Sequence, residues 1–287
     1  MTGLRFGVSI STSAAPGADP IADARTAERA GFDFVSASDH PGSAHPSYET
    51  WTMLTWIAAA TTGITVLPKV LGVPFRAPAL VAKSAESLSR LSAGRLILGL
   101  GASSDDQEVA SLGQPVRTPG GKLRGLADAI EIIRGLWREP AFSYPGEVYQ
   151  IEAAQLQPKP AQPIPVWLGT FGPRALDLTG QLADGWIPSL GYVPDDQIPV
   201  MRRRVLDAAA ASGRDPGSVT CALNLAVTVG AQHRGSGPFE GPVTKIADSL
   251  WRYVELGFTA FNLSPTGDPP AAQTELLAAG VLPALRS

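Results

Sequence analysis

The sequence has few of the features that would place it outside the ordinary globular proteins. It contains one cysteine, Cys221, so no disulfide can form within the chain. Its N-terminus lacks the basic start and apolar stretch of a signal peptide. No apolar run reaches the length of about 18 residues that a membrane span needs. These absences predict a cytoplasmic protein that does not enter a membrane.

The chain also lacks an excess of charge of one sign. Lys and Arg number 23 and Asp and Glu number 26, which leaves a formal net charge of −3, and both signs are spread along the chain. Nothing in this distribution indicates a nucleic acid or an anionic membrane as a partner. Because 44% of the 287 residues are hydrophobic, the chain can bury a large core.

Three common functional motifs are absent as well. No His-x-x-x-His spacing and no cysteine pair indicates a metal site, so we expect none. No Gly-x-Ser-x-Gly elbow is present, which disfavours a serine hydrolase. No glycine-rich phosphate turn follows the first expected strand, where a doubly wound open sheet usually carries one.

What the sequence does contain is an alternation of strand and helix patterns. Strands are expected near residues 4–10, 32–38, 64–70, 94–101, 166–168, 185–188, 219–229 and 258–263. Each is followed by a helical pattern, and residues 142–156 look like an inserted hairpin after the fourth unit. Eight such units predict a parallel sheet closed into a (β/α)8 TIM barrel, in one domain spanning 1–287. A doubly wound sheet is the alternative.

The stretch around Gly172 is typical of an anion site. Pro173 suits the first position of a helix, which makes Gly172 the expected N-cap. The N–H groups of Arg174 and Ala175 would then point out of the helix start, and Gly169 would let the backbone approach a ligand. A phosphate is the simplest ligand. The alternative is an ordinary turn that needs glycine for its dihedral angles.

One histidine stands at the end of an expected strand. In a closed barrel the C-terminal strand ends converge on one face, where catalytic groups sit. His40 ends the second strand there, while His45 and His233 lie in Gly/Pro/Ser-rich loops typical of the surface. An imidazole side chain can give or take a proton near neutral pH, so His40 is the candidate acid or base. Asp39 could act directly or could cap a turn.

Several motifs together resemble the bacterial luciferase-like superfamily of flavin- and deazaflavin-dependent oxidoreductases. They are Ser-Asp-His at 38–40, the glycine-rich strand at 91–101, Pro-Ile-Pro-Val-Trp-Leu-Gly-Thr-Phe-Gly-Pro-Arg-Ala-Leu at 163–176, and Ala-Asp-Gly-Trp at 183–186. The order and spacing match over nearly the whole chain. The resemblance implies a TIM barrel with the cofactor across its mouth, and Ser-Asp-His resembles the coenzyme F420 branch.

The resemblance also implies roles for individual residues. His40 and Asp39 would be catalytic, and Lys69–Val70 would form a bulge with a non-proline cis peptide behind the cofactor ring. The ribityl phosphate would lie on the turn after the fifth strand. The implied cofactor-binding residues are Asp39, Lys69, Val70, Ala102, Ser103, Ser104, Gly169, Thr170, Phe171, Gly172 and Arg174.

Two departures from the sugar dehydrogenases of this branch stand out. Those enzymes place a catalytic glutamate just after the fourth strand, where this chain has residues 102–104, Ala-Ser-Ser. They also carry a tryptophan shortly after the histidine, where this chain has residues 42–44, Gly-Ser-Ala. Asp105 and Asp106 are expected to be capping residues of the loop. These differences argue against a glucose-6-phosphate dehydrogenase of that type.

The resulting hypothesis is an oxidoreductase that transfers a hydride between coenzyme F420 and a small organic substrate. An FMN-dependent luciferase-like monooxygenase and a non-catalytic flavin- or deazaflavin-binding protein are the alternatives, and a phosphate-binding aldolase or isomerase barrel is weaker. The substrate stays open, although Trp51, Phe75 and Trp186 hint at an apolar pocket. A homodimer is expected by analogy alone.

Overall fold

The computed structural model describes residues 3–42, 44–103, 105–230, 237–267 and 270–286. Within these residues, ten strands form one sheet in the order β3-β2-β1-β12-β10-β9-β8-β5-β4, with β11 beside β10, and all their pairings are parallel. The strands are β1 (Arg5–Ser9), β2 (Phe34–Ala37), β3 (Thr65–Pro68), β4 (Leu71–Gly72), β5 (Leu98–Gly101), β8 (Val166–Leu168), β9 (Gly185–Trp186), β10 (Thr220–Val229), β11 (Glu240–Gly241) and β12 (Ala260–Pro265).

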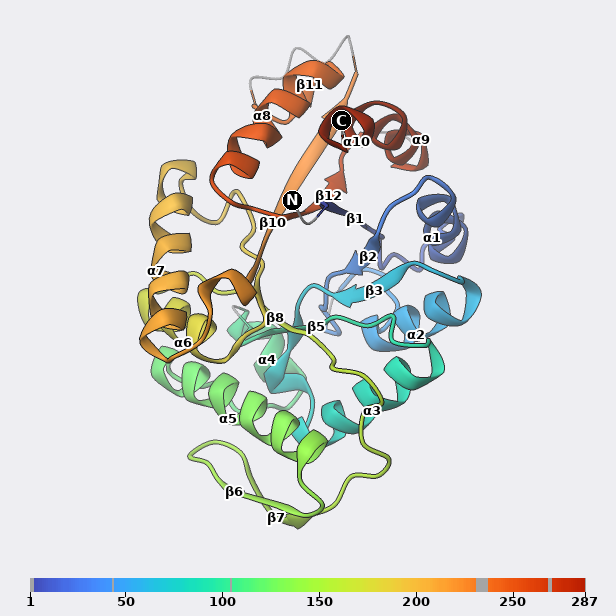
Figure 1. Ribbon diagram of the computed structural model, residues 1–287. Helices are drawn as coiled ribbons and strands as arrows, with labels where there is room; N and C mark the ends of the chain where they lie inside the picture. The colour runs from blue at the N-terminus through green and yellow to red at the C-terminus, as the bar shows by residue number, and fades with distance from the viewer. Residues whose placement is uncertain (1–2, 43, 104, 231–236, 268–269, 287) are drawn as a thin grey trace.

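The two ends of this sheet meet, so it closes into a barrel. Val66 of β3 forms a parallel bridge with Leu96, just before β5. Its N–H donates to the Arg95 carbonyl and its carbonyl accepts from the Ile97 N–H, both at 3.1 Å. Figure 1 shows the helices in a ring around the strands. The parallel (β/α)8 barrel that the alternation predicted is therefore confirmed, with β3 and β4 as the two halves of its third strand.

Helices surround the barrel, and all of them except α4 cover its outside. They are α1 (Pro20–Arg29), α2 (Thr50–Ala60), α3 (Pro78–Leu91), α4 (Asp106–Ser111), α5 (Pro119–Arg138), α6 (Pro173–Leu182), α7 (Ile198–Ala211), α8 (Val243–Glu255), α9 (Pro270–Leu276) and α10 (Leu282–Arg286), with 3-10 turns at Val73–Phe75, Asp195–Gln197 and Pro216–Ser218. Five of them, α1, α3, α5, α6 and α9, begin with proline, where a missing N–H costs nothing. Among the described residues, no helix combines the length and the apolar character that crossing a membrane requires.

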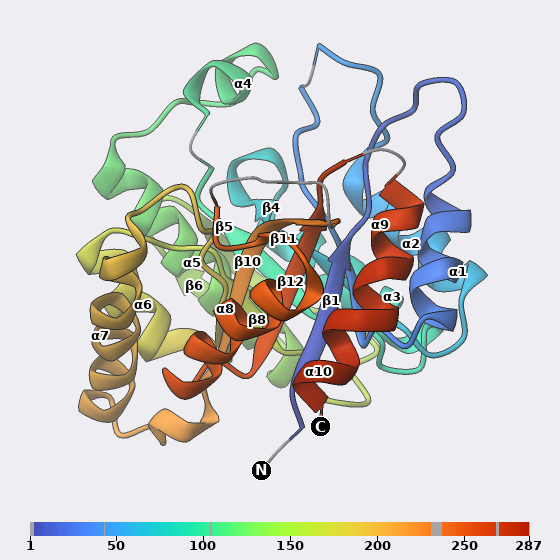
Figure 2. The ribbon, with the colours of Figure 1, turned by 90° about the horizontal axis from the view of Figure 1, so that it is seen from above.

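The structure departs from the expected helices in two places. The helical pattern that follows the eighth strand is interrupted by a π-helical segment, Leu277–Val281, so α9 and α10 are separate. The loop after β5 contains the short helix α4. The sequence did not predict it, because six residues are too few to show a helical period of apolar residues. Figure 2 shows α4 apart from the ring of helices, beyond the C-terminal ends of the strands.

Between α5 and β8 the chain forms a two-stranded antiparallel sheet, β6 (Phe142–Pro145) and β7 (Gln150–Ala154). It lies outside the barrel against α5 (Figure 1). The Phe142 ring occupies the place that a side chain at Gly135 of α5 would need, because a Cβ there would come within 2.1 Å of the ring. A glycine in the middle of this helix is therefore explained by close packing against the hairpin.

The described residues form two hydrophobic clusters, and the barrel encloses one of them. The inner one consists of Phe34, Leu67, Ile97, Trp167, Ile187, Ala222 and Ala260. The outer one fills the space between strands and helices and includes Phe6, Val8, Leu54, Ile130 and Leu263. Because side chains alternate along a strand, residues two positions beyond the inner cluster also point inward, toward the barrel mouth. These positions determine what lines the site.

Candidate active site

The third barrel strand is interrupted where the resemblance implied a bulge. The Lys69–Val70 peptide is cis, and it separates β3 from β4. A Cβ at Gly101 would come within 2.5 Å of the Val70 side chain, and one at Gly169 within 3.2 Å. The glycines at the ends of the fourth and fifth barrel strands thus make room for Val70. The predicted cis peptide is confirmed.

Asp39 lies beneath this bulge in a buried ion pair. Its Oδ2 accepts from the Gly72 N–H at 2.8 Å and from Arg76 Nη1 at 2.7 Å, and its Oδ1 accepts from Arg76 Nη2 at 2.9 Å. The Asp39 side chain has no exposed surface, and Arg76 also bonds Glu49. With both oxygens engaged, the carboxylate connects the ends of β2 and β4. This geometry favours a positioning role over the direct catalytic role expected from the sequence.

His40 stands above Asp39 and pairs with a glutamate from α4. His40 Nδ1 lies 3.0 Å from Glu108 Oε2, and Glu108 Oε1 accepts from the Gly42 N–H at 2.9 Å. The His40 side chain is 63% exposed, whereas that of Glu108 is 8% exposed. Asp105 begins α4 by accepting from the Glu108 N–H at 2.9 Å. The imidazole is therefore held at Nδ1 by a buried carboxylate, and its Nε2 remains for proton exchange.

Glu108 corrects one expectation from the sequence. The positions directly after β5, where the sugar dehydrogenases place a glutamate, hold small residues and supply no carboxylate beside the histidine. It comes instead from α4, several residues later in the chain, and the Asp105 cap sets its position. The signal in the sequence was Asp105 three residues before a glutamate, a typical helix start. The tryptophan of the sugar dehydrogenases has no counterpart at the same place in the sequence.

The turn after β8 forms the expected helix start. Gly172 is the N-cap of α6 and Pro173 occupies its first turn, as predicted. A Cβ at Gly172 would meet nothing within 4 Å, so the space beside it is open. The Ala175 N–H is not available, contrary to expectation, because it donates to the Gly172 carbonyl at 2.9 Å. Within the described residues no hydrogen bond engages the Arg174 N–H, which leaves it for an anion.

Thr170 holds this turn from inside. Its Oγ1 lies 2.7 Å from Thr179 Oγ1, and Thr179 donates its own proton to the Ala175 carbonyl at 2.7 Å. The Thr170 hydroxyl proton is therefore directed to Thr179. Trp186 Nε1 donates to the Thr170 carbonyl at 2.9 Å. The hydroxyl of Thr170, one of the implied cofactor-binding residues, stabilises the turn, while Thr170 still lines the cavity.

These groups surround one cavity of about 600 Å³ at the barrel mouth. Its lining contains ten of the predicted site residues: Asp39, His40, Lys69, Val70, Ala102, Ser103, Gly169, Thr170, Phe171 and Gly172. Arg174 is exposed beside it and does not line it, and Ser104 lies outside the described residues. Of the three aromatic residues expected in an apolar pocket, Phe75 lines the cavity, whereas Trp51 and Trp186 pack in the core.

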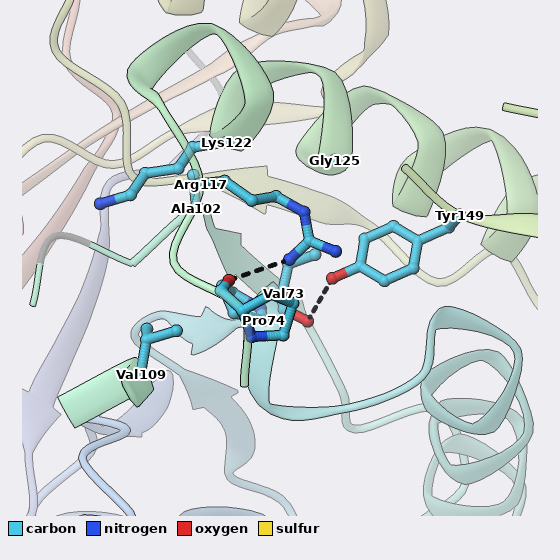
Figure 3. A pocket seen from close by; sticks show the side chains of 9 residues that line it. Val73, Pro74, Ala102, Val109, Arg117, Lys122, Gly125 and Tyr149 are labelled. Atoms are coloured by element: carbon cyan, nitrogen blue, oxygen red, sulfur yellow. Dashed lines mark hydrogen bonds between the residues drawn. The ribbon is translucent and has the colours of Figure 1, made fainter. Parts of the chain in front are cut away.

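A second, much smaller hollow lies next to the large cavity, under the start of α5. Arg117 stacks over the Tyr149 ring at 5.5 Å, and the Tyr149 hydroxyl donates to the Val73 carbonyl at 3.3 Å (Figure 3). The hollow shares Ala102 and Lys122 with the large cavity. Its volume of about 10 Å³ has room for one water at most. The large cavity is therefore the candidate active site.

The Glu108→Gln variant tests the histidine–glutamate pair. The amide keeps an oxygen for the Gly42 N–H but can present an NH₂ group to His40 Nδ1, which favours the wrong tautomer. We expect kcat to fall about 10- to 100-fold with little change in cofactor affinity, as expected when a group that orients the base is lost. Steady-state kinetics and a binding titration separate the two. Glu152→Gln in the hairpin is the matched control and should leave both values unchanged; equal kinetics in the two variants would contradict the assignment.

Comparison with known proteins agrees with this architecture. A model of the luciferase-like monooxygenase family matches residues 2–234. An F420-dependent glucose-6-phosphate dehydrogenase from Intrasporangium calvum is 29% identical, over 91% of this chain and 92% of that protein. A 5,10-methylenetetrahydromethanopterin reductase from Archaeoglobus fulgidus is 32% identical, over 61% of this chain and 50% of the reductase. An F420-dependent secondary alcohol dehydrogenase in complex with an F420-acetone adduct matches over the full length of both chains, with a TM-score of 0.89 and 18% identity.

Proposed function

Because the chain belongs to the luciferase-like monooxygenase family, we propose that it is an oxidoreductase that uses coenzyme F420 to transfer a hydride to or from a small organic substrate. The observation that carries this proposal is the His40–Glu108 pair, which faces the same cavity as the start of α6. The sequence relatives reported above include proteins named for F420-dependent sugar phosphate chemistry and for pterin reduction. These names differ in substrate, so the substrate is not proposed from them.

The cavity has features that fit a phosphate-bearing ring cofactor at two places. The open space beside Gly172 and the unpaired Arg174 N–H suit a phosphoryl group at the positive end of the α6 dipole. At the other place, Gly101 and Gly169 pack closely against the Val70 side chain of the Lys69–Val70 bulge, and these three residues line the cavity together. A flat ring can lie against such a surface. We propose that these two places hold the phosphate and the ring.

The chain's own residues then have separate tasks. When bound, the deazaflavin supplies a ring carbon that gives or accepts a hydride. His40 protonates the substrate oxygen during reduction, or accepts its proton during oxidation, at Nε2. Glu108 holds Nδ1 and so fixes which nitrogen faces the substrate. Asp39 and Arg76 hold the backbone of β4 beside the bulge.

Cofactor binding is tested by titrating the purified protein with F420 and with FMN. We expect F420 to bind, and we expect Gly172→Asp to weaken its Kd at least tenfold because a carboxylate would oppose the phosphate. Gly172→Ala should stay within threefold of the wild type, since its Cβ meets nothing within 4 Å. Gly3→Asp, at a second glycine with open space, is the control for the added charge. Equal affinity of the two Gly172 variants would contradict the phosphate assignment.

The same titration separates the alternatives. Both cofactors carry a phosphate, so the α6 anchor does not choose between them. Tight binding of FMN without F420 would favour the flavin-dependent monooxygenase. Tight binding of F420 by a protein that reduces and oxidises no substrate would favour a binding protein. The ionisable pair in the cavity is the observation that speaks against the latter.

A further inference from the structure

Lys69 places an ammonium group inside the barrel mouth. Leu67, two residues earlier on β3, belongs to the inner cluster, so Lys69 points the same way and lies one step closer to the mouth. The pairing of Ala37 with Pro68 puts Ser38, the residue directly after β2, beside Lys69. Both Lys69 and Ser38 line the large cavity. The interior of the barrel therefore changes from apolar at Leu67 to cationic at Lys69.

This ammonium has no carboxylate partner among the described residues. The acids that line the cavity are engaged elsewhere: Asp39 by Arg76, Glu108 by His40 and Gly42, and Asp105 by the start of α4. Burial lowers the pKa of the Lys69 ammonium to about 8. The other titratable groups that line the cavity are His40, Lys122 and Tyr192. A buried cation costs free energy unless an opposite charge faces it, and the part of the chain that the structure describes supplies none here.

A chain of hydrogen bonds ends at the same cavity. Ser36 Oγ donates to Asn262 Oδ1 at 2.8 Å, Asn262 Nδ2 donates to Asn224 Oδ1 at 2.7 Å, and Asn224 Nδ2 donates to Ser189 Oγ at 2.8 Å. Ser189 Oγ thus accepts the last hydrogen bond of this series, and its own hydroxyl proton remains for a further hydrogen bond. Such chains polarise the last donor. Ser189 and Asn224 both line the cavity.

We propose that Lys69 and Ser189 form a subsite for an anionic oxygen of the substrate, a carboxylate or a phosphate. The proposal builds on the function proposed above and adds the class of substrate to it. Both side chains can donate hydrogen bonds and neither carries a negative charge, so the subsite disfavours cations. A neutral alcohol or ketone would leave the Lys69 charge unopposed, whereas an anion removes that cost. His40 and Glu108 remain for proton transfer.

The test measures binding of small anions by calorimetry, with and without F420. Benzoate and inorganic phosphate are the two anionic probes, and benzamide is the neutral match to benzoate. We expect one of the anions to bind to the wild type at pH 7 at least tenfold more tightly than to Lys69→Met. Lys83→Met, on α3 and outside the cavity lining, should bind like the wild type. Affinity should fall as the pH rises above 8, where the free Lys69 loses its proton.

The outcomes separate the subsite from the cofactor. Ser189→Ala should weaken the same anion about threefold, which keeps the test valid if Lys69→Met folds poorly. Equal anion affinity in Lys69→Met and wild type, or no anion binding at 10 mM, overturns the proposal. A tenfold loss of F420 affinity in Lys69→Met without a loss of anion affinity also overturns it, because Lys69 would then serve the cofactor. Anion binding that depends on Lys69 in a protein that does not bind F420 supports the subsite and contradicts the proposed function.

Discussion

His40→Ala should lower kcat by about two to four orders of magnitude, the usual effect of removing a positioned acid or base. The loss should appear in turnover rather than in cofactor affinity, because the imidazole is 63% exposed at the cavity and pairs only with Glu108 through Nδ1 in the described structure. Stopped-flow measurement of the change in F420 absorbance reports the hydride transfer, and a titration reports the Kd. Thermal unfolding should change little.

The matched control for this variant is His45→Ala, a second histidine in the same loop that does not line the cavity. Its kcat should stay within about twofold of the wild type. If His40→Ala retains turnover within about threefold, the barrier has changed by roughly 0.7 kcal/mol only, and the acid–base assignment is wrong. A loss that appears equally in both histidine variants would point to the loop rather than to the imidazole.

Arg76→Met should lower the free energy of unfolding by about 3–5 kcal/mol, the range measured when one partner of a buried ion pair is removed. Asp39 has no exposed side-chain surface and Arg76 is 18% exposed, so the remaining carboxylate would be buried without a counter-charge. Denaturant unfolding at pH 7 measures the loss. Arg124→Met is the control: Arg124 pairs with Glu147 at 50% and 74% exposure, and such a pair contributes at most about 1 kcal/mol.

The decrease in the free energy of unfolding that Arg76→Met causes should also depend on pH. Burial raises the pKa of Glu49, but hydrogen bonds from Thr52 and Arg76 outweigh this and hold it below 4.5. A group with a lowered pKa stabilises the fold above its unfolded value and loses that contribution as the pH falls through the folded value. The difference between wild type and variant should therefore be largest near pH 7 and shrink below pH 4.5. A double variant, Asp39→Leu with Arg76→Met, should regain part of the stability because it removes the buried Asp39 carboxylate that Arg76→Met leaves unpaired.

Local patterns along the chain were sufficient for the architecture and for part of the site. Strand and helix periods determined the barrel, because each period follows from backbone geometry alone. Gly172 and Pro173 determined the start of α6 for the same local reason. The resemblance added the bulge at Lys69–Val70, whose cis peptide the structure contains. His40 followed from its place at the end of a strand, since strand ends converge on one face in any closed barrel.

Tertiary structure alone decided what these residues contact. Glu108 is 68 positions from His40, and Arg76 is 37 positions from Asp39, so neither pair leaves a periodic signal. The direction of the Thr170 hydroxyl depends on Thr179 in the following helix. The unopposed charge of Lys69 depends on how the acids of two other segments, Asp39 after β2 and Asp105 and Glu108 of α4, are engaged. Sequence patterns report the conformation of neighbouring residues in the chain. Which charges are paired, and which are left facing a cavity, is settled only when distant segments pack together.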